Sequence, residues 1–72
     1  MKELRFHRSV YDVAAVDAAI ATFERFAQIA RSEDGESVVV QITASSPARE
    51  RRVAGELGNF ALGTTIRDLG AR

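Results

Sequence analysis

Three short stretches of this chain are predicted to be β-strands, and in the first of them hydrophobic and polar residues alternate with the period of two that is typical of half-buried strands. In the first stretch Leu4 and Phe6 lie on one side and polar residues on the other. The third stretch is rich in β-branched residues, of which Val38, Val40 and Ile42 share one face. The predicted strands are Lys2–Arg8, Gln28–Ser32 and Ser37–Ala44.

Between the first two strands the apolar spacing changes to three and four, which predicts an amphipathic helix. Asp12 precedes this helix as its N-cap, and Ala19 and Phe26 widen its apolar stripe. A longer helical pattern follows the third strand, with Ser46 as N-cap and Pro47 at the first helical position. The predicted helices run from Val13 to Phe26 or Ala27, and from Pro47 to Leu69.

The last helix has two apolar faces when its residues are placed at about 100° intervals. A surface helix of a small domain needs only one apolar stripe, so the second face predicts contact with another molecule or with more of this chain. Three glycines in this helix indicate close backbone packing or a kink at Gly63. The predicted core face holds Val53, Leu57, Phe60, Ala61 and Thr64; the second face holds Leu62, Ile66 and Leu69, with Gly58 beside them.

The order of elements predicts an α+β fold. A right-handed crossover makes the first two strands parallel, and a hairpin at Asp34-Gly35 returns the third strand between them. We therefore expect one domain, residues 1–72, with the order β-α-β-β-α. Its three-stranded sheet has the strand order 1-3-2 and both helices on one face, like a ferredoxin-like split unit that lacks its fourth strand. The first strand then forms an open edge.

Composition and charge exclude several classes of function. The chain has no cysteine and one histidine, so it cannot build a thiolate metal site, and we expect no metal and no cofactor. Ten basic and ten acidic residues are interspersed, which argues against nucleic-acid binding. The cluster Arg49–Arg52 includes an acid, and we interpret it as a solvated helical face rather than a phosphate site. No signal peptide or membrane span is predicted, and a cytoplasmic location is expected.

No residue pattern indicates an enzyme. His7 is compatible with a proton shuttle or with half of a metal site in a dimer, although a solvent-facing strand residue explains it more simply. Ser9 lacks the setting of a nucleophile. A domain this small usually needs stabilisation beyond its hydrophobic core, such as disulfides, a metal or oligomerisation. A chain without cysteine can still gain it by oligomerisation. We therefore expect a homodimer or another homo-oligomer.

Two surfaces are candidates for binding. Along the open edge, Arg5 and His7 can select an extended peptide or a second copy of the strand, while the alternative is that charged side chains only protect the edge. On the last helix, the second apolar face can pair with a partner. The candidate interface residues are Arg5, His7, Gly58, Leu62, Ile66 and Leu69.

Two stretches together resemble the HxsD family of the His-Xaa-Ser peptide-modification systems. The first is a strand that runs into Ser9–Tyr11 and is followed by a helix. The second, Leu57–Leu62, is similar to the family signature Leu-Asn-Asp-Tyr-x-Leu-Arg-Glu. In this stretch Phe60 occupies the position of the signature tyrosine, Asn59 that of the aspartate and Gly58 that of the asparagine. The helix residues in the first match are Ala15, Val16 and Ala19, and Gly63-Thr64 replaces Arg-Glu in the second.

This resemblance implies a small accessory protein encoded beside radical-SAM maturases that modify a ribosomally made peptide. Such an accessory binds the precursor peptide or the maturase enzyme and has no catalytic role of its own. The alternative is a purely structural homo-oligomeric domain whose apolar helix face serves self-association.

Overall fold

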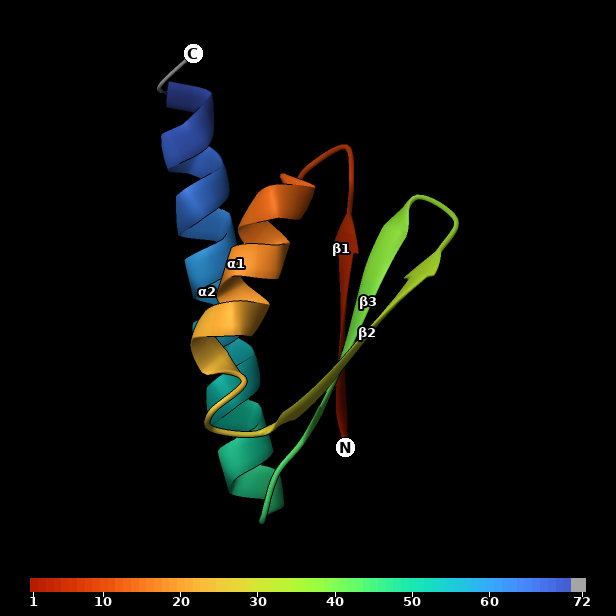
Figure 1. The fold of residues 1–72 in the computed structure, drawn as a ribbon, viewed down its shortest axis with the longest axis vertical. Helices are drawn as coiled ribbons and strands as arrows, with labels where there is room; N and C mark the ends of the chain where they lie inside the picture. Colours follow the sequence, from red (N-terminus) through yellow and green to blue (C-terminus); the bar gives the residue numbers. More distant parts are fainter. Residues whose placement is uncertain (71–72) are drawn as a thin grey trace.

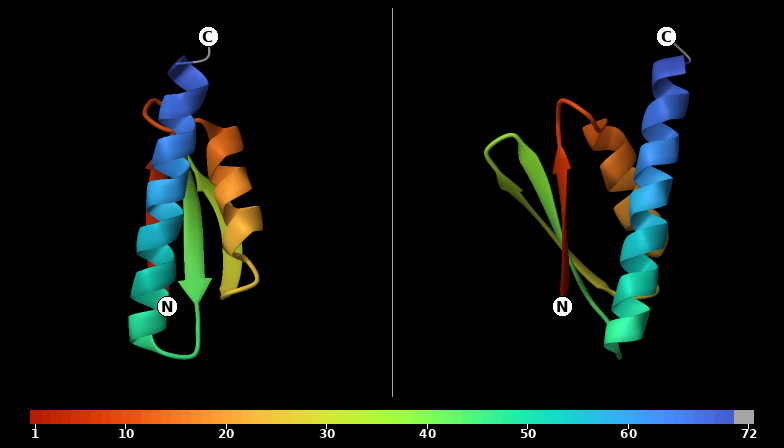
Figure 2. Two further views of the ribbon diagram at one scale, coloured as in Figure 1. Left: turned by 90° about the vertical axis from the view of Figure 1, so that its left-hand side faces the viewer. Right: turned by 180° about the vertical axis from the view of Figure 1, so that it is seen from behind.

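A computed structural model of the chain describes the backbone of residues 1–70 and the side chains of residues 1–67. Its elements follow the order β-α-β-β-α, which confirms the predicted α+β fold. Both helices lie on one side of the sheet, so the domain has two layers (Figures 1 and 2). The elements are β1 (Lys2–His7), α1 (Val13–Phe23), β2 (Gln28–Asp34), β3 (Ser37–Thr43) and α2 (Pro47–Gly70).

The sheet has the predicted order β1-β3-β2, with β3 antiparallel to both neighbours. In the described part of the chain β1 is therefore an edge strand. The β2–β3 hairpin turns at Gly35 and Glu36, and Gly35 has a φ of 61°, which glycine adopts without strain. The predicted turn was too long, because Glu33 and Asp34 pair with β3 and continue β2.

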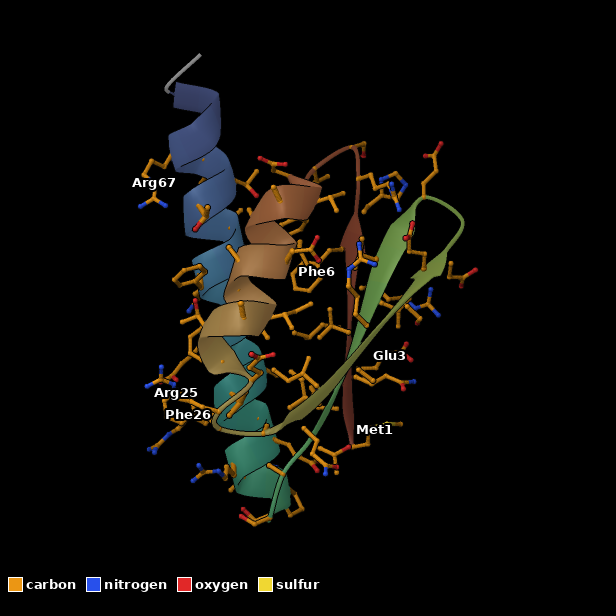
Figure 3. The ribbon with its side chains drawn as sticks, viewed as in Figure 1. Met1, Glu3, Phe6, Arg25, Phe26 and Arg67 are labelled. Carbon is orange, nitrogen blue, oxygen red and sulfur yellow. The ribbon has the colours of Figure 1, made fainter. Side chains whose placement is uncertain are left out.

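The core lies between the helices and the inner face of the sheet. Phe6 of β1 is 4% exposed and lies on the helix side, whereas Glu3 lies on the opposite side (Figure 3). The inner residues of β3 are buried completely because β3 is the central strand and both helices lie over this face. These residues are Val38, Val40 and Ile42, as the alternation predicts.

The core face of α2 is rotated slightly from the predicted one. Phe60 and Thr64 are only half-buried, while their neighbours Ala54 and Thr65 are buried. The backbone N–H of Asp12 donates to the Thr65 hydroxyl at 3.1 Å, which ties the start of α1 to α2. Burial of Thr65 removes its hydroxyl from water, and this hydrogen bond gives the hydroxyl oxygen a partner inside the protein. Buried as predicted are Val53, Leu57 and Ala61.

Helix α1 begins as predicted but ends early. The Asp12 carboxylate accepts the N–H of Ala14 at 3.2 Å and caps the first turn. The helix stops at Phe23 because the chain must reverse before β2 begins at Gln28. Phe26 therefore leaves the apolar stripe of α1 and is 44% exposed, which contradicts its predicted place in the core.

The first turn of α2 contains one inward-facing acid. Glu50 is 8% exposed, accepts the N–H of Ala44 at 3.1 Å and lies 2.9 Å from the amino group of Met1. The hydrogen bond from that amino group, followed by the one from Ala44, lowers the pKa of Glu50. The Ser46 hydroxyl accepts the N–H of Arg49 at 3.1 Å, which confirms the predicted N-cap.

We expect the stabilisation by Glu50 to be lost in acid. Because its pKa is lowered by folding, its contribution is fully present above the ordinary pKa near 4.5 and disappears as pH falls through the folded value. Thermal melts of the unchanged protein and of Glu50→Gln between about pH 3 and pH 7 measure this. The difference in melting temperature should be largest near neutral pH and shrink in acid; a constant difference would rule out the carboxylate charge as its cause.

Candidate functional site

The predicted second face of α2 is exposed. Leu62 is 40% exposed and Ile66 60%, and both lie on the side of α2 opposite its buried residues. Gly55 and Gly58 follow the same side at helical spacing. We call Gly55, Gly58, Leu62 and Ile66 the outer face of α2. Leu69, also predicted there, lies outside the residues whose side chains are described.

Gly55, Gly58 and Gly63 of α2 have open space where a side chain would begin. Helix α2 is continuous from Pro47 to Gly70, so the kink considered at Gly63 is absent from it (Figure 1). A Cβ added at Gly55, Gly58 or Gly63 would meet none of the described atoms within 4 Å, so these positions are not packed against the rest of the described fold either. Each still weakens the helix by up to about 1 kcal/mol relative to alanine.

Arg5, predicted at the open edge, is held over the sheet. Its guanidinium donates to Asp34 of β2 at 2.9 Å and to Glu3 at 3.1 Å. The hydrogen bond to Asp34, and then that to Glu3, raises the pKa of Arg5. Because Arg5 is in β1 and pairs with Val39 of β3, the ion pair spans the central strand. Val39 is 4% exposed although no helix covers this face (Figure 1).

His7 is also engaged within its own fold. Its Nδ1 lies 2.7 Å from the Ser9 hydroxyl and 3.1 Å from the Ser9 N–H, and its Nε2 is 3.5 Å from Glu36. The sequence did not predict this serine–histidine–carboxylate contact. It lacks the enclosed setting of a hydrolase, because the His7 side chain is 49% exposed and that of Glu36 81%. Within residues 1–67 no cluster of three or more metal-ligating residues forms around it or elsewhere.

The backbone of β1 nevertheless offers an edge. The N–H of Arg8 donates to the Glu36 carbonyl, at the continuation of the β1–β3 register. In an antiparallel pair such inward-pointing amides alternate with outward-pointing ones. The amide of Leu4 therefore points toward β3, and those of Arg5 and His7 point toward the open edge.

The five candidate interface residues whose side chains are described form two separate groups. Arg5 and His7 belong to β1, on the side of the sheet away from the helices. Gly58, Leu62 and Ile66 lie on the outer face of α2, which points away from the sheet. The structure does not bring the two groups together, so a single partner must be large to contact both.

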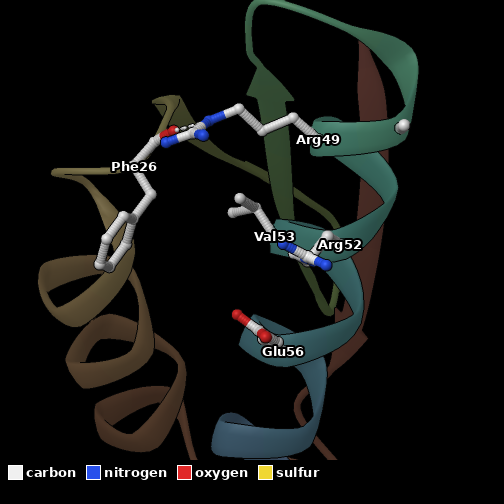
Figure 4. A pocket seen from close by; sticks show the side chains of 6 residues that line it. Phe26, Arg49, Arg52, Val53 and Glu56 are labelled. Carbon is white, nitrogen blue, oxygen red and sulfur yellow. Dashed lines mark hydrogen bonds between the residues drawn. The ribbon is translucent and has the colours of Figure 1, made fainter.

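A third surface, which the sequence did not predict, is a groove between the end of α1 and the first turns of α2 (Figure 4). Its volume is about 580 Å³. Arg49 reaches across it, and its Nε donates to the Phe26 carbonyl at 3.1 Å. We call it the arginine groove; its lining residues are Phe26, Ala48, Arg49, Arg52, Val53 and Glu56.

The arginine groove follows from the direction of Glu50. The acid in the cluster Arg49–Arg52 faces inward, so it does not neutralise the arginines on either side of it. A sequence signal for this existed: Glu50 precedes Leu57 by seven residues, which places it on the core face. At the end of α1 and in the first turns of α2, four arginines have no carboxylate of residues 1–67 within 4.0 Å, whereas Arg5, Arg8 and Arg31 are paired. The four are Arg25, Arg49, Arg51 and Arg52.

Neither helix, over residues 1–70, is long and apolar enough to cross a membrane. Comparison of the chain with protein-family models, with curated proteins and with solved structures finds no match.

Proposed function

We propose that this protein is a small non-catalytic binding module that forms a homodimer through the outer face of α2. The observation that carries the proposal is the exposure of Leu62 and Ile66 beside Gly55 and Gly58, where an added Cβ would meet no described atom within 4 Å outside the backbone of α2. Large apolar side chains on a small surface helix are common at contact surfaces. Glycines in open space weaken a helix without a benefit unless another backbone approaches them.

The outer face of α2 is complementary to itself in an antiparallel pair. If two copies of α2 cross midway between Gly58 and Leu62, each Leu62 lies opposite the partner's Gly58. Each Ile66 then lies at the level of the partner's position 54, one residue or about 1.5 Å along the helix axis from Gly55. This large-to-small arrangement satisfies the two-fold symmetry of most homodimers, in which the same patch is used twice. Full burial of each Leu or Ile contributes roughly 1.5–3 kcal/mol.

We expect Leu62→Asp and Ile66→Asp to convert the dimer to a folded monomer. Both side chains are exposed in the single copy, so a buried charge arises only when the partner is present. Sedimentation equilibrium measures the mass, and circular dichroism checks the fold. Ala18→Asp, which adds the same charge at an exposed position of α1, is the matched control and should remain dimeric. A monomeric unchanged protein at millimolar concentration would refute self-association.

The specific role that we propose is that of a cytoplasmic accessory in the maturation of a ribosomally made peptide. The similarity of Leu57–Leu62 and of the Ser9–Tyr11 region to the HxsD family supports this proposal. In that role the protein binds the precursor peptide or the radical-SAM maturase. The open edge of β1 suits an extended peptide, because its outward amides and carbonyls can pair with a further strand.

Co-purification with the products of neighbouring genes tests the specific role. The protein should retain a neighbouring maturase or precursor peptide when they are co-expressed. Recovery of the protein alone would favour the second candidate, a structural homo-oligomer whose only contact is the outer face of α2. The Ile66→Asp monomer shows whether partner capture depends on self-association.

A further inference from the structure

We infer that the arginine groove binds a short peptide segment in which one carboxylate lies beside a large apolar side chain. The inference deepens the proposed function, on which it rests for the view that this protein binds peptides. It concerns neither the outer face of α2 nor the edge of β1.

The groove offers an apolar contact that is held in place. Phe26 is 44% exposed, and its ring centroid lies 6.2 Å from that of Phe23, which in turn packs edge-on against Phe60 at 5.9 Å. Val53 lies between the two helices at the floor of the groove (Figure 4). An exposed aromatic ring fixed by its neighbours is an efficient platform for an apolar side chain, because little rotational freedom is lost on binding.

Guanidinium groups surround this platform. The Nε hydrogen bond to the Phe26 carbonyl fixes Arg49 and leaves its terminal nitrogens free to donate to a carboxylate. The guanidinium carbon of Arg25 lies over the Phe26 ring, 5.9 Å from its centroid, and Arg52 lines the groove from α2. Since these cations have no carboxylate partner among residues 1–67, an incoming anion does not have to displace one.

The hollow continues past Phe26 and Arg49. A second depression shares both residues and extends from Glu24, at the end of α1, to Thr43, at the end of β3. Glu56 lines the first depression, so an acid stands on each side of the shared arginine. A nucleic-acid strand places a phosphate at every nucleotide and would meet one of these acids. A peptide with a single carboxylate flanked by neutral residues avoids repulsion from both acids.

The probe is an acetylated, amidated hexapeptide of sequence Gly-Gly-Asp-Phe-Gly-Gly, titrated into the ¹⁵N-labelled full chain. We expect amide shift changes centred on Phe26, Arg49 and Arg52. Replacement of the peptide aspartate by asparagine should weaken binding about tenfold, the typical effect of losing one charged hydrogen bond. A peptide ending in Phe with a free carboxylate tests whether the anion is a side chain or a chain terminus.

Three arginine variants locate the site. Arg49→Gln and Arg52→Gln should each weaken binding of the Asp-Phe peptide about tenfold. Arg51→Gln removes the same charge from an exposed position between them that does not line the groove, and should change binding less than about twofold. The spectrum of each free variant confirms that the fold is retained.

Several outcomes would overturn the inference. Equal losses in all three variants would indicate a general charge effect, and equal binding of the asparagine peptide would remove the role of the carboxylate. Tighter binding of a single-stranded octanucleotide at physiological salt would favour nucleic acid. Shift changes confined to β1 or to the outer face of α2 would refute the groove but leave the proposed function intact. That function fails separately if co-expressed peptide and maturase are not retained.

Discussion

Leu57→Ala is expected to leave the protein largely unfolded at 25 °C. Leu57 is completely buried near the middle of α2. Truncation of a buried leucine to alanine costs about 2.7–5 kcal/mol. Domains of this size have a net stability of roughly 3–5 kcal/mol, so the loss consumes most of it. Circular dichroism at 222 nm and a urea titration of the variant measure the effect.

Leu62→Ala is the matched control, because it makes the same chemical change on the opposite face of the same helix. Leu62 is 40% exposed in the single copy, so its truncation should cost the monomer less than about 1 kcal/mol. Both variants are compared at low concentration, where dissociation of the dimer does not add to the free energy of unfolding. Similar destabilisation by the two changes would contradict the assignment of the core face of α2.

The predicted elements come from patterns that act over a few residues. The alternation around Leu4 and Phe6 defines β1, and the polar caps Asp12 and Ser46 define where the helices begin. Because a three-residue spacing cannot fit a strand and a two-residue spacing cannot fit a helix, these patterns also fix the order β-α-β-β-α. The strand order follows from that order and from the handedness of the crossover.

The errors arose where contacts distant in sequence decide the outcome. Phe26 belongs to the apolar stripe of α1 by spacing, but the chain reverses before β2 and exposes it. Thr65 is buried, and its hydroxyl accepts a hydrogen bond from the N–H of Asp12, 53 residues earlier. The spacing of Glu50 from Leu57 indicates its inward direction, but its contact with the amino group of Met1 depends on a residue distant in the sequence. None of these partners is adjacent in the sequence.

The candidate sites also divide into features that local sequence patterns predict and features that depend on contacts distant in the sequence. The exposed apolar side chains of Leu62 and Ile66 were predictable, because the period of a helix alone places them opposite its core. The contacts of Arg5 and His7 were not, since they depend on the register that brings Asp34 and Glu36 near β1. Both side chains contact groups of their own fold, and the backbone of the open edge is the part of β1 that can supply affinity for a further strand.

Proline at two neighbouring positions of β1 should therefore have opposite results. Leu4→Pro removes an amide that points toward β3 and places a ring against the central strand, so we expect it to unfold the protein. An unpaired acceptor on β3 alone costs about 1–3 kcal/mol. Arg5→Pro removes an amide that points outward. Relative to Arg5→Ala, which also loses the ion pair with Asp34, it should change the stability by less than about 1 kcal/mol.

The same pair of variants decides whether the open edge binds a partner. If a peptide or a second strand pairs with β1, Arg5→Pro abolishes its capture while Arg5→Ala retains it, because only the proline variant lacks the outward amide. Leu4→Ala, compared with Leu4→Pro, separates the loss of a half-buried side chain from the loss of the inward amide. Equal stability of Leu4→Pro and Arg5→Pro would show that the amide directions are assigned wrongly. If Arg5→Pro folds and captures its partner as tightly as Arg5→Ala does, the charged residues of β1 only protect an edge, and binding belongs to α2 and the arginine groove.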